Sequence, residues 1–386
     1  AVLPQIMRWP LRNLRIPDLS RVRAVSSEVS ANFIVPGTQG DARRLRVIEE
    51  EVIRAREPRT SAGMTKPVRR SENEIGQWRC NMCSSWLPVS EFYTYAGVPK
   101  CYCKLCQSRR NVEYNDTTRG YFKLLLRNAK RRSRIRTELG RPSAGNYGLD
   151  LDDLLNIYLQ QGGRCSYSAI AMNMQAYTDW QCSLERVNPE EGYVVDNVVL
   201  IASEFQVRTQ WSWEKVLSLK EHGSDKDVDS DVPSLEDSPD LFLHYGTKLI
   251  IDLKRVLGSA RSAAAIRKRN GRASAGICKL TLDDVVSLYA TQRGKCAYSR
   301  IPFDCQGLQD WQMSIERYDN TAGYTGDNCA LICRAFQSSD RTLLAPPYRL
   351  VRGSSQWSVE KFSRLQHWLE LPQARDWIKS QAKTVF

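Results

Sequence analysis

Four cysteines in two closely spaced pairs are the residues of this chain best suited to chemistry. Cys80-x-x-Cys83 and Cys103-x-x-Cys106 lie about 20 residues apart, the spacing typical of a structural Zn²⁺ ion held by four thiolates. Cys101 is close enough to compete, but C-x-x-C closes a better knuckle than C-x-C. A thioredoxin-like redox role would need a surrounding βαβ pattern, which the sequence lacks. We therefore predict that Cys80, Cys83, Cys103 and Cys106 bind zinc.

An internal repeat carries a second set of candidate residues, present twice. Residues 141–206 and 272–337 align without a gap, with roughly 30 identities in about 66 positions, far more than unrelated segments share. Each copy contains an S-[LI]-E-R segment, a G-Y-x-x-D-N segment and a closing F-Q. The similarity continues into WSWEKV, from Trp211, and WSVEKF, from Trp357. We therefore expect two structural units of one kind.

The repeated string SLERVNPEEGYVVDNVVLIASEFQ resembles the core of HNH (ββα-metal) nucleases, in their phage and PacI-like restriction branch. The CNMC…SEFY…CKLC block is similar to a four-cysteine segment that precedes such a core in that branch. The resemblance covers about residues 78–213 and again about residues 252–357. It implies an α+β fold of two tandem HNH-like units with helical flanks, preceded by a small zinc-binding module and an extended basic N-terminal arm.

The resemblance also implies a role for four positions in each copy. In the first copy, the metal ligand that is normally Asp is Glu185, and Arg186 follows where most members have a histidine base. The final ligand, normally His or Asn, is Gln206, and Tyr167 is placed to act as a substitute base. The equivalent residues of the second copy are Glu316, Arg317, Gln337 and Tyr298.

Both copies depart from the family pattern in the same way. Glu for Asp and Gln for Asn each add one methylene on opposite sides of the metal, and Mg²⁺ tolerates little displacement of its ligands. The three histidines all lie outside the motifs, so a histidine base is absent. A compensated, working site and a degenerate scaffold are the alternatives, and the sequence favours the scaffold. Mg²⁺ is expected only if the nuclease interpretation holds.

A basic segment follows the cysteine pairs and contains few acids. Its cations cover more than one face of a helix, so some must project into solvent, where each can neutralise a phosphate. An ordinary solvated helix is the alternative. The predicted nucleic-acid-binding residues are Arg109, Arg110, Lys123, Arg127, Lys130, Arg131, Arg132, Arg134 and Arg136.

The hydrophobic pattern indicates the elements that position these residues. Residues 42–56 have helical periodicity, and LDLDDLLNIYLQQGG reads as a helix capped by Asp150 or Asp152. SLERV and VVLIA read as strands, and SEFQ as the start of another helix. The predicted domains are an extended arm with a short helix (1–73), a zinc module (74–108), the first repeat with its basic helix (109–219), an acidic linker (220–241), the second repeat (242–370) and a C-terminal tail (371–386).

The overall charge of +13 over 386 residues favours a polyanionic partner. We expect RNA rather than DNA, together with other proteins of a large assembly, and no transmembrane segment, since no apolar run reaches about 18 residues. The arginine-rich start suggests the mitochondrion or another organelle matrix, with the nucleus as the alternative.

Three functions fit these features. The first is a non-catalytic, nucleic-acid-binding structural subunit of a large organellar assembly of the mitochondrial-ribosome type. The second is an active metal-dependent HNH-type DNA endonuclease. The third is an accessory subunit of another large organellar complex, with its basic surfaces facing protein or lipid headgroups.

Overall fold

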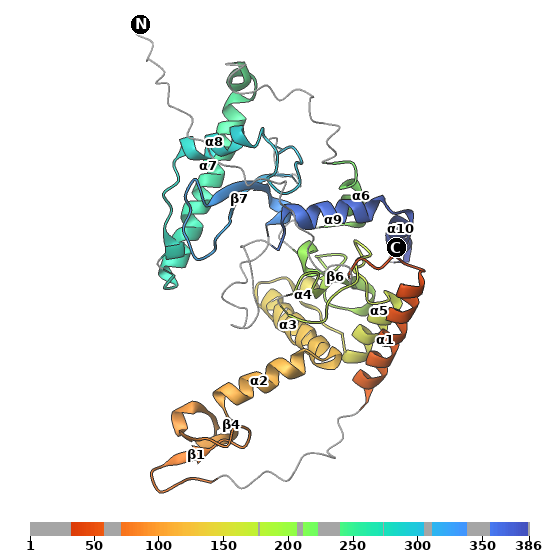
Figure 1. Cartoon of the computed structure of the whole chain (residues 1–386), viewed down its shortest axis with the longest axis vertical. Coiled ribbons are helices and arrows are strands. Elements are labelled where there is room, and N and C mark those ends of the chain that lie inside the picture. The colour runs from red at the N-terminus through yellow and green to blue at the C-terminus, as the bar shows by residue number, and fades with distance from the viewer. Residues whose placement is uncertain are drawn as a thin grey trace. The chain divides into compact units, whose positions relative to one another are not determined.

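The computed structural model describes residues 32–57, 71–176, 178–206, 211–222, 240–272, 274–304, 311–337 and 356–384. Helices and two-stranded antiparallel sheets make up the fold (Figure 1), so the predicted α+β class is confirmed at that level. The chain forms two compact units. Of the described residues, one unit contains 240–334 and the other contains 32–222 and 335–384. The basic arm up to residue 31 and most of the acidic linker lie outside these ranges.

The cysteine module consists of two hairpins and a helix. A tight turn at Ala96 and Gly97, both with positive φ (48° and 78°), joins the strands of the second hairpin. Such a turn matches the right-handed twist of paired strands. The elements are β1 (Gln77–Arg79), β2 (Trp86–Pro88), η3 (Val89–Glu91), β3 (Phe92–Tyr95), β4 (Val98–Cys103) and α2 (Lys104–Asn115), with β1 paired to β2 and β3 to β4.

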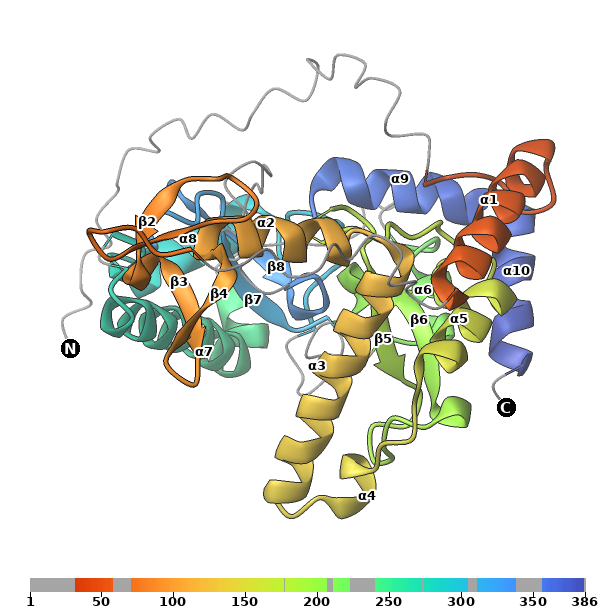
Figure 2. The ribbon, with the colours of Figure 1, turned by 90° about the horizontal axis from the view of Figure 1, so that it is seen from below.

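The first repeat is a β-hairpin packed against helices. The predicted strands form β5 and β6, which lie beside α3 and α5 (Figure 2). The predicted N-terminal helix is α1 (Gln39–Arg56), and it packs on α3 and α5. The elements of the repeat are α3 (Thr118–Glu138), α4 (Pro142–Gly145), α5 (Leu151–Gln160), β5 (Cys182–Arg186), η4 (Val195–Asn197), β6 (Val198–Ala202), η5 (Ser203–Phe205) and α6 (Trp213–Ser218).

The second repeat builds the same hairpin. Met313 pairs with Cys333, as Cys182 pairs with Ala202 in the first repeat, and the register agrees at all five pairs. The helix before each hairpin begins with a capping box, Asp150 with Asp153 in α5. The elements are α7 (Asp240–Arg269), η7 (Ser274–Gly276), α8 (Leu282–Thr291), β7 (Met313–Arg317), β8 (Cys329–Cys333) and η8 (Arg334–Phe336).

The prediction that an α-helix starts at SEFQ is wrong. Residues Ser203–Phe205 form a single 3-10 turn, and the next α-helix among the described residues begins at Trp213. The carboxylate of Glu204 points back to accept a hydrogen bond from the Trp180 backbone N–H, 2.7 Å away. Because Glu204 is fully buried in this contact, the segment is held by tertiary interactions rather than by helix propensity.

The C-terminal helices belong to a different unit from the one expected. We predicted that residues up to 370 complete the second repeat, yet α9 (Val359–Glu370) and α10 (Pro372–Thr384) lie in the unit of the first repeat. Trp357 packs edge-on against Trp180, with ring centroids 5.9 Å apart, and the indole of Trp368 donates to the Ser168 carbonyl at 2.7 Å. Burial of these large aromatic side chains stabilises the arrangement. Within the described ranges, no helix is both long and apolar enough to cross a bilayer.

Candidate metal centre and nucleic-acid interface

The four predicted metal-binding cysteines converge. The sulfur atoms of Cys80, Cys83, Cys103 and Cys106 all lie within 4.8 Å of one another. A Zn–S distance of about 2.3 Å puts the sulfurs of a tetrahedral site about 3.8 Å apart, so a small contraction would close them around an ion. Cys101 lies outside the cluster; its carbonyl accepts from the Asn81 N–H at 2.9 Å. The cluster is therefore able to hold a metal ion, as the sequence spacing predicts.

The electrostatics of the cluster suit a soft divalent cation. Burial opposes ionisation of Cys80, but the backbone N–H groups of Cys103, Cys83 and Met82 lower the pKa of its thiol to about 6. Burial raises the pKa of Cys106 to about 12. One thiol is thus ready to ionise while its neighbour resists a second negative charge. A bound cation would supply the positive charge that lets all four ligate as thiolates.

Five cations form a stripe along one face of α3. They are separated mainly by three or four residues, which places them on one side of a helix over about 17 Å. The opposite face is buried through Tyr121, Phe122 and Ala129. We call this set the α3 stripe; it consists of the exposed side chains of Lys123, Arg127, Lys130, Arg131 and Arg134.

The cations of the α3 stripe have few acidic partners among the described residues. Only Arg134 forms an ion pair there, with Glu138 at 3.3 Å, and both side chains are exposed. Lys130 lies 6.0 Å from the ring centroid of Tyr147. The remaining positive charge faces solvent, where it can attract a polyanion.

The other predicted cations have different surroundings. Arg109 and Arg110 are exposed on α2, and the guanidinium of Arg110 lies 4.4 Å from the ring centroid of Tyr102. Arg132 is exposed near Glu185, where burial raises the pKa of the carboxyl and the charge of Arg132 offsets only part of that rise. Arg136 is half-buried, 5.4 Å from the ring of Tyr193, and its Nη1 is buried without a hydrogen-bond partner. Arg136 therefore faces the hairpin rather than bulk solvent.

The turn between β5 and β6 is held by Asn197. Its Nδ2 donates to the carbonyls of Asn188 and Gly192 at 3.0 and 2.9 Å, while its Oδ1 accepts from the Asn188 N–H at 2.8 Å. Gly192 is required because a Cβ there would lie 2.1 Å from the carbonyl oxygen of Asn146. The glycine and the asparagine of the G-Y-x-x-D-N motif thus have a structural explanation.

Arg186 also contributes to this turn. Its Nη1 donates to the carbonyls of Pro189 and Glu191 at 2.6 and 2.5 Å, and the guanidinium lies 5.4 Å from the ring centroid of Tyr193. The role that the resemblance implies for this position is chemical. The geometry instead assigns its hydrogen bonds to the backbone of its own hairpin.

The other three candidate residues of the first repeat meet beside β5. The carboxamide of Gln206 donates from Nε2 to the Leu184 carbonyl at 2.7 Å and accepts from the Ser183 hydroxyl. Burial raises the pKa of Glu185, whose carboxylate accepts from the Arg186 N–H at 3.0 Å. Tyr167 is buried, and burial together with the charge of Glu185 raises its pKa. A tyrosine held in its neutral form is a poor general base.

The second repeat reproduces the contacts of the arginine. The Nη1 of Arg317 donates to the carbonyls of Asn320 and Ala322 at 3.1 and 2.6 Å, as Arg186 does in the first repeat. Glu316 and Arg317 are each only 1% exposed, so the ligand position in this copy is closed off from solvent. Tyr298 and Gln337 are half-buried.

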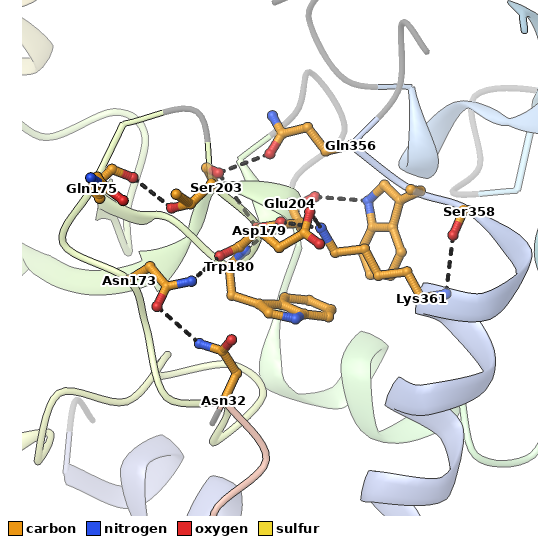
Figure 3. A network of polar contacts seen from close by, with 12 residues as sticks. Asn32, Asn173, Gln175, Asp179, Trp180, Ser203, Glu204, Gln356, Ser358 and Lys361 are labelled. Carbon is orange, nitrogen blue, oxygen red and sulfur yellow. Dashed lines mark hydrogen bonds and ion pairs between the residues drawn. The ribbon is translucent and has the colours of Figure 1, made fainter. Parts of the chain in front are cut away.

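One buried polar network was not foreseen from the sequence. Figure 3 shows Lys361 of α9 reaching Asp179 and Glu204 of the first repeat, with Nζ to oxygen distances of 2.8 and 2.5 Å. The indole N–H of Trp357 donates to the Glu204 carbonyl at 3.1 Å. Lys361 also lies 4.5 Å from the ring centroid of Trp180. The available signal was the lysine shared by WSWEKV and WSVEKF.

Comparison of the chain with known protein families, with characterised proteins and with solved structures finds no significant match.

Proposed function

We propose that this chain is a non-catalytic, nucleic-acid-binding protein built on two HNH-like units and a structural zinc module. The α3 stripe carries this proposal. Few acidic side chains of the described residues pair with its exposed cations. A phosphate backbone can therefore neutralise them and release condensed counterions. RNA is the polymer we favour, within a large assembly of the mitochondrial-ribosome type in an organelle matrix.

The geometry of the hairpins supports a non-catalytic role. At the final ligand position, the carboxamide of Gln206 is already engaged by the Leu184 carbonyl and the Ser183 hydroxyl. The buried Tyr167 is unsuited to activating water. These residues act instead as parts of a folded scaffold.

The test is the salt dependence of nucleic-acid binding. A variant with Lys123, Arg127, Lys130 and Arg131 all changed to Gln should bind a labelled single strand more weakly, and the slope of log K against log[salt] should fall by roughly 3. The matched control changes Arg43, Arg46, Arg54 and Arg56 of α1 to Gln. It removes the same charge from a helix in which exposed Glu49 and Glu50 accompany the cations, so its slope should change little.

Two outcomes would contradict the proposal. The wild-type chain could fail to bind RNA or DNA in anisotropy measurements at about 50 mM salt, or the two quadruple variants could lose affinity equally. The nuclease alternative is tested separately, by incubating plasmid and RNA with the protein and Mg²⁺, Mn²⁺ or Zn²⁺. We expect no cleavage. Metal-dependent nicking that disappears in Glu185→Ala or Glu316→Ala would establish the endonuclease instead.

A further inference from the structure

The cysteine module exposes large aromatic side chains on both of its hairpins. Trp86 on β2 is 41% exposed, and Tyr93 and Tyr95 on β3 are 50% and 80% exposed. The core of the module is made by other residues, since Phe92 and three of the cysteines are buried together with Trp78, Leu87 and Tyr102 packed against them. Exposed large rings on both hairpins are candidate contacts for a partner.

Cations accompany these rings. Arg79 is the cross-strand neighbour of Trp86 in the first hairpin. The Nζ of Lys104 lies 5.9 Å from the ring centroid of Tyr93. Tyr95 stands at the tip of the second hairpin, opposite the exposed Val98 and next to the tight turn. Each hairpin therefore offers a flat apolar face with a positive charge beside it.

The charge around the rings identifies the chemistry of the partner. Between residues 71 and 110 the exposed acids are Glu72, Glu74 and Glu91. The exposed cations of the same segment are Arg79, Lys100, Lys104, Arg109 and Arg110. An apolar protein surface would gain nothing from this excess of positive charge. A polyanion that also presents flat aromatic faces matches both properties, and unpaired nucleotides are such a ligand.

We propose that the two hairpins of the cysteine module bind unpaired bases, with Trp86, Tyr93 and Tyr95 as stacking platforms. The proposal rests on the nucleic-acid-binding function and adds a preference for single strands. Phosphate contacts from the α3 stripe do not distinguish single strands from duplexes, whereas the faces of the bases are accessible only where the strand is unstacked.

The experiment compares two probes with the full-length, zinc-loaded chain. One is a fluorescein-labelled RNA strand of about 16 nucleotides, long enough to cover the usual binding site for a single strand. The other is the same strand paired with its complement. Tyr95→Ala, Tyr93→Ala and Trp86→Ala should each weaken single-strand binding by roughly 5- to 150-fold, the range that base stacking contributes. Duplex binding should stay unchanged. Tyr95→Phe should retain single-strand affinity, because the ring is kept.

Matched controls separate stacking from a change in folding. Tyr318→Ala removes a tyrosine of the second repeat that is also exposed (57%) and should leave both affinities unchanged. Zinc content and circular dichroism of each hairpin variant should equal those of the wild type. If the ring-to-alanine variants bind the single strand normally while the α3 stripe variant is impaired, the stacking proposal is overturned and the nucleic-acid-binding function stands. If the wild type binds neither probe, both are overturned.

Discussion

The two sequence repeats share a hairpin but differ in what surrounds it. In both, an asparagine closes the turn, an arginine donates to the turn carbonyls, and a glutamine joins the preceding helix to the second strand. Gln161 holds Leu200 through its side-chain Nε2 at 2.7 Å and Oε1 at 2.8 Å, and Gln292 holds Leu331 with the same two distances. These shared contacts all satisfy backbone groups, so they are requirements of the fold.

The differences lie in charged side chains. Glu204, which receives Lys361, is replaced in the second repeat by Ala335, and Arg164, which pairs with Asp41 of α1, is replaced by Lys295. The first repeat thus has buried ion pairs to segments distant in the sequence, α1 and α9. The hairpin is therefore the scaffold that the two repeats share. In the first repeat, ion pairs also attach it to α1 and α9.

Removal of Glu204 should have the largest effect on this difference. Glu204→Ala gives the first repeat the residue of the second. It leaves Lys361, which is 7% exposed, without its buried partner and with only the exposed carboxylate of Asp179. Breaking a buried ion pair costs about 3–5 kcal/mol. The free energy of unfolding, from a guanidinium titration followed by tryptophan fluorescence, should fall by that amount.

A double variant tests whether the pair itself is responsible. Glu204→Ala with Lys361→Met removes both charges, and it should recover much of the lost stability because no unpaired charge stays buried. Glu360→Ala, at an exposed position of α9, should change the free energy of unfolding by less than about 0.5 kcal/mol. Equal losses in the single and double variants would assign the cost to the other contacts of Glu204, such as the hydrogen bond it accepts from the Trp180 N–H, and not to the charge of Lys361.

The shared turn should respond alike in both repeats. Asn197→Ala and Asn328→Ala each remove two donated hydrogen bonds and one accepted hydrogen bond within the turn. Each should cost about 1–3 kcal/mol, with the larger value at Asn197, which is the more buried of the two. Asn128→Ala on the exposed surface of α3 is the control. A large effect in one repeat and none in the other would show that the hairpins are not equivalent.

The elements that could be predicted from the sequence are those determined by neighbouring residues. The helix Leu151–Gln160 follows from a capping aspartate and an apolar face, and the hairpin strands follow from short apolar runs on either side of a turn. The cysteine cluster follows from spacing alone, because C-x-x-C pairs constrain where their sulfurs lie. Each of these depends on residues close together in the chain.

Contacts between distant residues were not predictable in this way. Lys361 and Glu204 are 157 positions apart, and no periodic pattern links them. The hydrogen bonds of Gln206 with Ser183 and Leu184 depend on the conformation of the glutamine side chain. The sequence motif does not specify that conformation. The exposed rings of the cysteine module did have a signal, the alternating aromatics of FYTY, in which only Phe92 is buried.

A last prediction concerns acid and the ion pair between Asp41 and Arg164, whose atoms lie 2.5 Å apart. Burial acts to raise the pKa of Asp41, but the Gly37 N–H and the charges of Arg164 and Arg44 outweigh it and lower the pKa below 3.8. The unfolded chain therefore binds this proton first, so the pair's contribution is present above pH 3.8 and is lost as the pH falls through the folded pKa.

Asp41→Asn should be less stable than the wild type at neutral pH. Its free energy of unfolding should also fall less steeply below pH 4 in urea titrations, since no carboxylate is left to protonate. If the free energy of unfolding changes equally steeply with pH in the two proteins, other carboxylates cause the acid sensitivity of this unit.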